Sequence, residues 1–154
     1  MGNIAIRQAT LSDLPGIIAL LADDELGRQR EDASVPLNAA YLNAFQTIAA
    51  DPNQLLMVAA EDGELVGTLQ LTFLPGLSRR GAWRGQIEAV RIAEKRRGAG
   101  LGRQMFAWAI AACRQRGCNL VQLTTDKRRT DAHRFYEQLG FTASHEGYKM
   151  ALEE

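Results

Sequence analysis

Hydrophobic residues occur along the chain in two patterns, a helical period and short apolar runs. The apolar residues that follow the capping residues 10–13 stand at positions i, i+3, i+4 and i+7, which predicts a helix. These residues are Leu14, Ile17, Ile18 and Leu21. Similar spacing predicts helices over 37–50, 100–116 and 132–139. Short runs rich in apolar residues predict strands over 3–7, 55–60, 65–74, 86–92 and 120–124.

Turn residues separate these segments and set the order of the elements. Asp62-Gly63 lies between two strand-like runs and predicts a tight hairpin. The polar stretches 27–36 and 77–85 show neither pattern and are expected to be loops. The tail 140–152 is expected to form one or two strands. The resulting order predicts a mixed α/β (α+β) domain. We expect a largely antiparallel sheet of about six or seven strands flanked by about four helices.

The composition narrows the class of protein. The 154 residues correspond to a single domain over 1–154. The 18 basic residues balance the 18 acidic ones, which argues against a protein that binds nucleic acid over its whole surface. The longest apolar run, 105–113, is too short to span a bilayer. We therefore expect no nucleic-acid partner and no membrane association.

The cysteines and histidines predict free thiols and no metal site. Cys113 and Cys118 are the two cysteines, and together with two histidines they show no spacing typical of zinc ligands. The N-terminal residues lack the charged segment and the long apolar stretch of a signal peptide. These features predict a cytoplasmic protein.

The clearest chemical signal is the segment 96–103, Arg-Arg-Gly-Ala-Gly-Leu-Gly-Arg, between a predicted strand and a predicted helix. Glycines allow backbone conformations that are closed to other residues, and they keep side chains away from a ligand. The first turn of the following helix has unpaired N–H groups at the positive end of the helix dipole. The segment is therefore suited to hold a phosphate group, and Arg97 and Arg103 can add positive charge.

Other nucleotide-binding motifs fit this segment less well than a phosphate cradle does. A P-loop needs lysine and then serine or threonine after its last glycine, where Arg103 and Gln104 stand. A dinucleotide-binding fingerprint needs a small residue at the position of Met105. A glycine-rich connection without a ligand stays open, although alternating glycines with flanking arginines at a helix start favour a binding site.

Two motifs together make the sequence resemble the GNAT superfamily of N-acetyltransferases. The phosphate loop of that family, Arg/Gln-x-x-Gly-x-Gly/Ala, is matched by residues 97–102. A second family signature, Ala-x-x-x-Tyr-x-x-x-Gly-Phe, is matched by residues 132–141. The order of the elements is also similar over 4–152. The resemblance implies one GNAT-like domain that binds acetyl-CoA and transfers its acetyl group to an amine.

The resemblance also implies roles for individual residues. Main-chain groups of Val90 and Ile92 would pair with the pantetheine arm and polarise the acetyl carbonyl, and Tyr136 would protonate the departing thiolate. Arg129 stands where many members carry an asparagine that contacts the coenzyme, so that contact is in question. The residues expected to hold the pyrophosphate are Arg97, Gly98, Ala99, Gly100, Leu101, Gly102 and Arg103.

Glu88 is the candidate general base. Acetyl transfer needs a neutral amine, and an alkyl amine is mostly protonated at neutral pH, so a nearby base is useful. Regular strand alternation places Glu88 on the same face as Val90 and Ile92. An equally weighted alternative is a carboxylate at the sheet margin that pairs with an arginine. For Tyr136 the alternative is an aromatic core residue.

The other reactive side chains are expected to take no part in the chemistry. A covalent route through Cys113 or Cys118 is disfavoured because neither has an evident neighbouring base. His133 and His145 are expected at the surface. The segments 23–32 and 77–85 are candidates for shaping the acceptor pocket, with exposed connections as the alternative.

Three classes of function follow. The leading hypothesis is an N-acetyltransferase that moves an acetyl group from acetyl-CoA to a primary amine of a small molecule or peptide, by direct transfer in a ternary complex. The alternative is a non-catalytic acyl-CoA-binding or sensing module on the same fold. A third hypothesis, nucleic-acid binding through the arginine clusters, lacks a recognition motif. A homodimer is compatible with the resemblance, and the sequence does not identify the acceptor.

The zero net charge conceals a separation of charge along the chain. Residues 79–103 contain eight basic and two acidic residues, whereas residues 13–32 contain six acidic and two basic ones. In the family's fold the basic segment includes the phosphate site, and the acidic segment flanks the acceptor side. This polarity suits an anionic coenzyme and a cationic amine.

Overall fold

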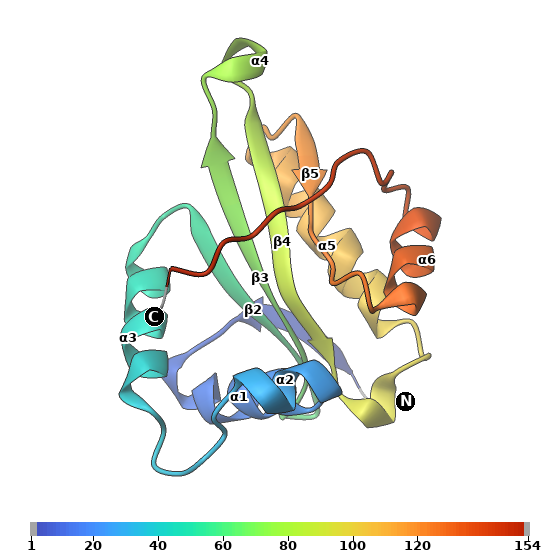
Figure 1. The fold of residues 1–154 in the computed structure, drawn as a ribbon. Coiled ribbons are helices and arrows are strands. Elements are labelled where there is room, and N and C mark those ends of the chain that lie inside the picture. Colours follow the sequence, from blue (N-terminus) through green and yellow to red (C-terminus); the bar gives the residue numbers. More distant parts are fainter. Residues whose placement is uncertain (1–2, 153–154) are drawn as a thin grey trace.

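Five strands form one sheet in the order β1-β2-β3-β4-β5 in the computed structural model, which describes residues 3–152 (Figure 1). The first four strands pair antiparallel, and β4 pairs with β5 in parallel. The predicted fold class, a mixed and largely antiparallel α/β sheet, is confirmed. The strands are β1 (Ile4–Gln8), β2 (Gln54–Glu61), β3 (Glu64–Pro75), β4 (Trp83–Ile92) and β5 (Leu120–Gln122).

Six α-helices surround the sheet in residues 3–152, and none of them is long and apolar enough to cross a membrane. In Figure 1, α1 and α2 lie in front of the sheet, α5 lies behind it, α3 lies beside β2, and α4 lies at the tip of the β3–β4 hairpin. The helices are α1 (Leu14–Ala22), α2 (Glu25–Arg30), α3 (Ala39–Ala50), α4 (Ser78–Gly81), α5 (Leu101–Gln115) and α6 (Thr130–Gln138).

The largest apolar core lies between the sheet and α5. This helix presents one buried stripe at helical spacing, as its sequence predicts. The side chains of β3 that face it are Leu69, Leu71 and Phe73, all of them buried. The buried residues of the stripe are Leu101, Met105, Phe106, Ala109 and Cys113. This packing holds the start of α5 firmly against the sheet.

The tail 140–152 corrects the predicted strand count. These residues form no strand, so the sheet of the described chain has five strands instead of about six or seven. In Figure 1 the tail runs across the front of the sheet from α6 toward α3. Its apolar residues Tyr148, Met150 and Leu152 are 84–90% exposed. Their alternation is typical of a strand, but a strand also needs backbone hydrogen bonds to a neighbouring strand, and residues 142–152 make none in the described chain.

The helix count is also higher than predicted. The four expected helices correspond to α1, α3, α5 and α6, and the structure adds the short helices α2 and α4. The segment predicted as the loop 27–36 therefore begins inside α2, and β4 begins within the predicted loop 77–85. Helices of four to six residues are too short to show an apolar period. The Asp62-Gly63 hairpin is confirmed, with positive φ angles at both residues.

Candidate functional site

The strands β4 and β5 part soon after they meet. They pair over three residues, ending at Gln86 and Gln122. Within residues 3–152, no strand pairs with the rest of β4 on that side. The carbonyl groups of Val90 and Ile92 accept hydrogen bonds from arginine side chains instead. The donors are Arg91 Nη1 (2.9 Å) and Arg97 Nε (3.1 Å). This edge of β4 is therefore suited to pair with an extended ligand.

The glycine-rich segment forms a cradle at the N-terminus of α5. Gly98 (φ 80°) and Gly100 (φ 87°) adopt left-handed conformations, which glycine tolerates without strain. Among the N–H groups of the helix, that of Gln104 is the first to bond to a carbonyl, that of Gly100, so the N–H groups of residues 101–103 lack helical partners. A cavity of about 280 Å³ lies here, lined by Ile92, Arg96, Arg97, Gly98, Gly100, Gly102, Arg103 and Phe135.

The cavity contains some of the residues expected to bind the coenzyme but not all of them. Val90, Ala99 and Leu101 do not line it, and the Leu101 side chain is buried in the core, so Leu101 can face a ligand through its backbone alone. Arg96 and Phe135 line it without having been predicted. Arg96 stands next to the motif, whereas Phe135 reaches the cavity because α6 packs against α5. The expected residues that do line it are Ile92, Arg97, Gly98, Gly100, Gly102 and Arg103.

A bulge interrupts β4 beside this opening. Thr68 of β3 pairs with Arg91, but Gln70 pairs with Glu88, so two residues of β4 stand opposite one residue of β3. The bulged residue Ala89 has a φ of 54°, a conformation that is uncommon for residues other than glycine. Such bulges turn the side chains that follow them toward the other face of a sheet.

The bulge makes the expected position of Glu88 wrong. Regular alternation places Glu88 on the face of Val90 and Ile92, but the register places it on the face of Arg91. Val90 and Ile92 pack against the core on the α5 side. Glu88 and Arg91 therefore share the opposite face, which is the front of the sheet in Figure 1.

Glu88 belongs to a row of polar side chains across this front face. Its Oε1 lies 3.5 Å from Gln86 Nε2, and Gln86 in turn accepts a hydrogen bond of 3.0 Å from Gln122. Glu88 is exposed and makes no ion pair within residues 3–152, so the expected alternative, a carboxylate paired with an arginine, is not observed there. Its carboxylate is accessible to a ligand on the front face.

Tyr136 lies where the aromatic residues of α5 and α6 meet. Its ring centroid is 5.7 Å from those of Phe106 and Phe135 and 6.3 Å from that of Phe141. Burial raises the pKa of the Tyr136 phenol, and the nearby guanidinium groups of Arg129 and Arg91 lower the pKa in part. The phenol therefore carries its proton at neutral pH.

Arg129, the position that departs from the family's pattern, meets Arg91 at one carboxylate. Asp24 Oδ2 lies 2.9 Å from Arg91 Nε and 3.1 Å from Arg129 Nη2. Asp24 also caps α2 by accepting a hydrogen bond of 2.5 Å from the N–H group of Gly27. Burial by itself would raise the pKa of Asp24, but this hydrogen bond and the two guanidinium groups lower the pKa overall. The three charged residues connect α2, β4 and the start of α6.

Three of the six acidic residues in the segment 13–32 pair with arginines. Asp13 pairs with Arg7 at 2.7 Å, and Asp23 lies 3.9 Å from Arg97 of the cradle. Asp24 pairs with two more arginines, as described above. The separation of charge along the sequence is therefore partly cancelled in space, and these carboxylates do not form a free acidic surface for a cationic amine.

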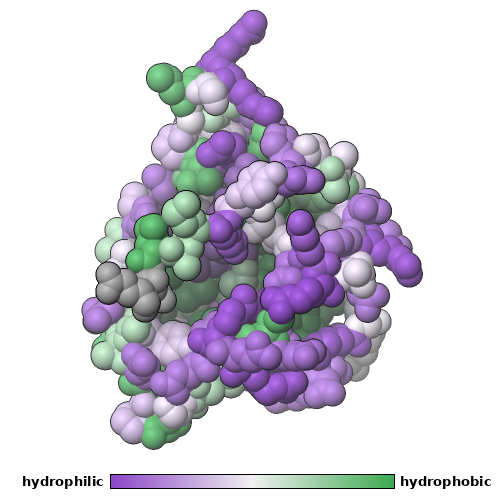
Figure 2. Space-filling model, viewed as in Figure 1, coloured by the Kyte–Doolittle hydropathy of each residue, from purple (hydrophilic) through white to green (hydrophobic). Residues whose placement is uncertain are grey.

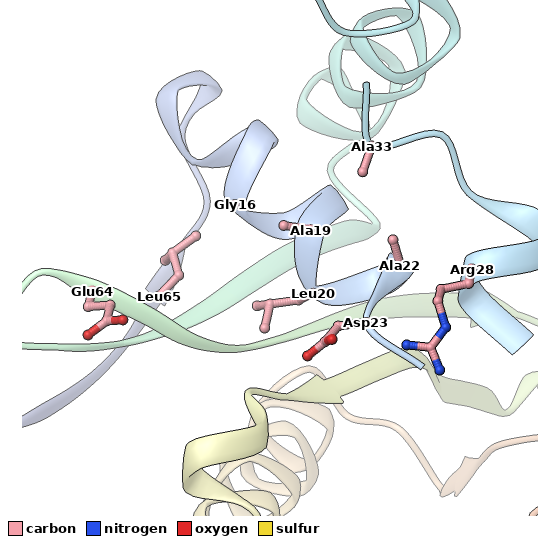
Figure 3. A pocket seen from close by; sticks show the side chains of 9 residues that line it. All are labelled: Gly16, Ala19, Leu20, Ala22, Asp23, Arg28, Ala33, Glu64 and Leu65. Carbon is pink, nitrogen blue, oxygen red and sulfur yellow. The ribbon is translucent and has the colours of Figure 1, made fainter. Parts of the chain in front are cut away.

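A larger depression, of about 660 Å³, lies beside α1, between this helix, the start of β3 and Arg28 of α2 (Figure 3). Its walls are mostly small or apolar side chains, with Asp23, Arg28 and Glu64 as the charged ones. The depression includes none of Tyr136, Glu88 and the cradle. We therefore take the opening where β4 and β5 part as the candidate site. The lining residues are Gly16, Ala19, Leu20, Ala22, Asp23, Arg28, Ala33, Glu64 and Leu65.

Cys113 is unsuited to act as a nucleophile. It is 1% exposed, and burial, with a smaller contribution from Cys118, raises the pKa of its thiol to about 12. We expect iodoacetamide to leave Cys113 unmodified in the folded protein at pH 8 and to modify it after unfolding in urea, because the thiolate is the reactive form. Mass spectrometry of tryptic peptides measures this. The partly exposed Cys118 is the internal control, and rapid labelling of native Cys113 would contradict the expectation.

The glycine-rich cradle at the start of α5 and the free edge of β4 next to it form the part of this fold best suited to bind an extended, phosphate-bearing ligand. Residues 18–141 match the model of the acetyltransferase (GNAT) family, and the chain belongs to this family. The aminoalkylphosphonate N-acetyltransferase of Salmonella typhimurium (strain LT2) is 33% identical over 147 residues, which cover 96% of this chain and 90% of that protein. The predicted family and enzyme class are confirmed.

Two solved structures share the whole fold. A transcriptional regulator from Bacillus halodurans C-125 is 52% identical, with a TM-score of 0.95 over 97% of this chain and 100% of that chain. A putative acetyltransferase from Agrobacterium tumefaciens str. C58 is 30% identical, with a TM-score of 0.83 over 96% of this chain and 99% of that chain.

Proposed function

We propose that this protein transfers an acetyl group from acetyl-CoA to the primary amine of a small molecule, directly within a ternary complex. The observation that carries the proposal is the arrangement along β4: the cradle adjoins one end of its free edge, and Glu88 flanks the bulge toward the other. The guanidinium group of Arg91, just after the bulge, acts on the Tyr136 phenol. A coenzyme with a pyrophosphate and an extended arm fits this order of groups.

The residues present fit acetyl-CoA. The backbone N–H groups at the start of α5 and the arginines Arg97 and Arg103 would hold the pyrophosphate. The carbonyls of Val90 and Ile92 would exchange their arginine donors for amide groups of the pantetheine arm. Gly102 matters because any larger side chain at this position would project into the cavity beside Phe135.

Two side chains would move the protons that the transfer requires. Acetyl-CoA supplies a thioester, whose C–S bond breaks as the bond between carbon and the amine nitrogen forms. Glu88, on the accessible front face, would take a proton from the amine directly or through water. Tyr136 would give its proton to the departing sulfur, which burial of the phenol favours by keeping the proton bound at neutral pH.

The first acceptor to test follows from a relative. The Salmonella typhimurium protein is an aminoalkylphosphonate N-acetyltransferase, and this chain spans 90% of it. We therefore propose a short primary amine as the acceptor, with 2-aminoethylphosphonate as the first compound in a panel that also holds neutral amines, polyamines, aminoglycosides, amino acids and a peptide.

The test is release of free thiol from acetyl-CoA with each amine of this panel. We expect Glu88→Gln to lower kcat/KM about 10- to 100-fold at pH 7, with a smaller loss at pH 9, where more of the amine is already neutral. Glu137→Gln, an exposed position on α6, is the matched control and should leave the rate unchanged. An equal loss at both pH values would argue against Glu88 as the base.

The alternative function is a non-catalytic acyl-CoA-binding module. It predicts binding of acetyl-CoA by calorimetry, no thiol release with any amine, and no effect of Glu88→Gln. The accessible Glu88 and the protonated Tyr136 favour catalysis over this alternative. Binding without transfer over the whole panel would overturn the proposed function.

A further inference from the structure

We propose that the front face of β4 binds the acceptor as a zwitterion, with its amine facing Glu88 and an oxyanion group facing Arg91 and Arg129. The inference rests on the proposed function and names the substrate class of that same site: a short primary amine that carries a phosphonate, phosphate or carboxylate group. Both charged ends of the subsite come from residues that the bulge and the ion pairs bring together.

The bulge sets the spacing of the opposite charges. Glu88 and Arg91 pair with Gln70 and Thr68, which are two residues apart on β3. Two residues of an antiparallel strand span about 7 Å, whereas three residues of a regular strand would span about 10 Å and end on the other face. A carboxylate and a guanidinium group thus start about 7 Å apart on one face. This spacing suits a molecule whose amine and anion are separated by a few bonds.

The positive end has unused capacity for an anion. Arg91 and Arg129 share one carboxylate oxygen of Asp24, so one carboxylate serves two guanidinium groups. The Arg91 side chain is 12% exposed, and its Nε, although 2.9 Å from Asp24, is buried without a hydrogen bond of suitable geometry. Arg30 and Glu31 also act on Arg91, with opposite charges. The remaining N–H groups of the two guanidinium groups could donate hydrogen bonds to an oxyanion that accepts two of them at once.

The subsite lies beside the proposed point of transfer. Arg91 follows Val90 directly, and both arginines act on the Tyr136 phenol, so the anion would lie close to the reacting amine. Figure 2 shows a hollow on this face, between the tail and the helices α1, α2 and α6, with hydrophilic residues crowded along its lower and right-hand rims. Short acceptors are expected to fit, and a second cationic group would be repelled by the arginines.

The experiment compares 2-aminoethylphosphonate with ethanolamine, which replaces the phosphonate by a neutral hydroxyl group. We expect wild-type kcat/KM to favour the phosphonate at least about tenfold, because hydrogen bonds between charged groups are stronger than those to a neutral hydroxyl group. Arg129→Gln should lower the ratio of the two kcat/KM values about tenfold, and Arg91→Lys, which keeps the charge at the more buried position, should lower it less. Arg128→Gln, an exposed neighbour paired with Asp126, is the control and should leave the ratio unchanged.

The outcomes separate the zwitterion subsite from a structural role and from the proposed function. If both acceptors lose the same factor in Arg129→Gln, or if the wild-type protein shows no preference for the phosphonate, the subsite is wrong while N-acetyl transfer stands. If no amine of the panel is acetylated, the proposed function fails, and calorimetric titration of 2-aminoethylphosphonate into the wild-type and Arg129→Gln proteins then tests the subsite alone. Equal affinity of the two proteins would overturn it.

Discussion

Tyr136→Phe is expected to lower kcat about 100- to 10,000-fold at pH 7, the range found for removal of a general acid. The substitution removes one hydroxyl group and keeps the ring, so the contacts with Phe106, Phe135 and Phe141 are retained. The Kd for acetyl-CoA should change less than about twofold, because the lost interaction acts in the transition state and not in the bound ground state. Steady-state kinetics and calorimetry on the same preparations measure the two quantities.

The pH dependence gives an independent check of Tyr136. Burial raises the pKa of the phenol above its usual value near 10, so the phenol keeps its proton until the solution is strongly alkaline. Loss of this proton should therefore lower the wild-type kcat only at such high pH. The control is Tyr148→Phe on the exposed tail, which should leave kcat unchanged. An unchanged kcat in Tyr136→Phe would reject the acid role and leave the aromatic packing as the reason for this residue.

Phe106→Ala is expected to lower the free energy of unfolding by about 3–5 kcal/mol, the usual cost of removing a buried aromatic side chain. Phe106 is 1% exposed and lies against Phe135, Tyr136 and Phe141, so its loss leaves a cavity between α5 and α6. Domains of this kind are stable by about 5–15 kcal/mol, so the variant would lose a large share of its stability. Urea denaturation followed by circular dichroism measures the change.

The control for Phe106→Ala removes an exposed side chain. Leu77 is 96% exposed, and Leu77→Ala should change the free energy of unfolding by less than about 0.5 kcal/mol. Phe106→Leu should lie between the two, because it fills part of the cavity. A loss below about 1 kcal/mol in Phe106→Ala would show that α6 repacks easily, and it would then weaken the view that this cluster positions Tyr136.

The residues of the cradle illustrate what a local pattern can predict. The alternating glycines 98–102 and the helix that follows are neighbours in sequence, and their backbone conformations depend on one another directly. The backbone turn and the start of α5 were therefore predictable from their own few residues. Phe135, which also lines the cavity, was not, because its place there depends on how α6 packs against α5.

The sequence by itself determined the order of the main elements, the glycine-rich turn and the family, because periodicity, turn chemistry and short motifs act between residues a few positions apart. The tertiary structure alone decided which face of the sheet Glu88 lies on and which charged side chains pair. One extra residue opposite Leu69 moved Glu88 to the face of Arg91, a shift that regular alternation cannot predict. Asp24 joined Arg91 and Arg129 from distant segments. Such pairings depend on register and packing across the whole sheet, which patterns between neighbouring residues do not contain.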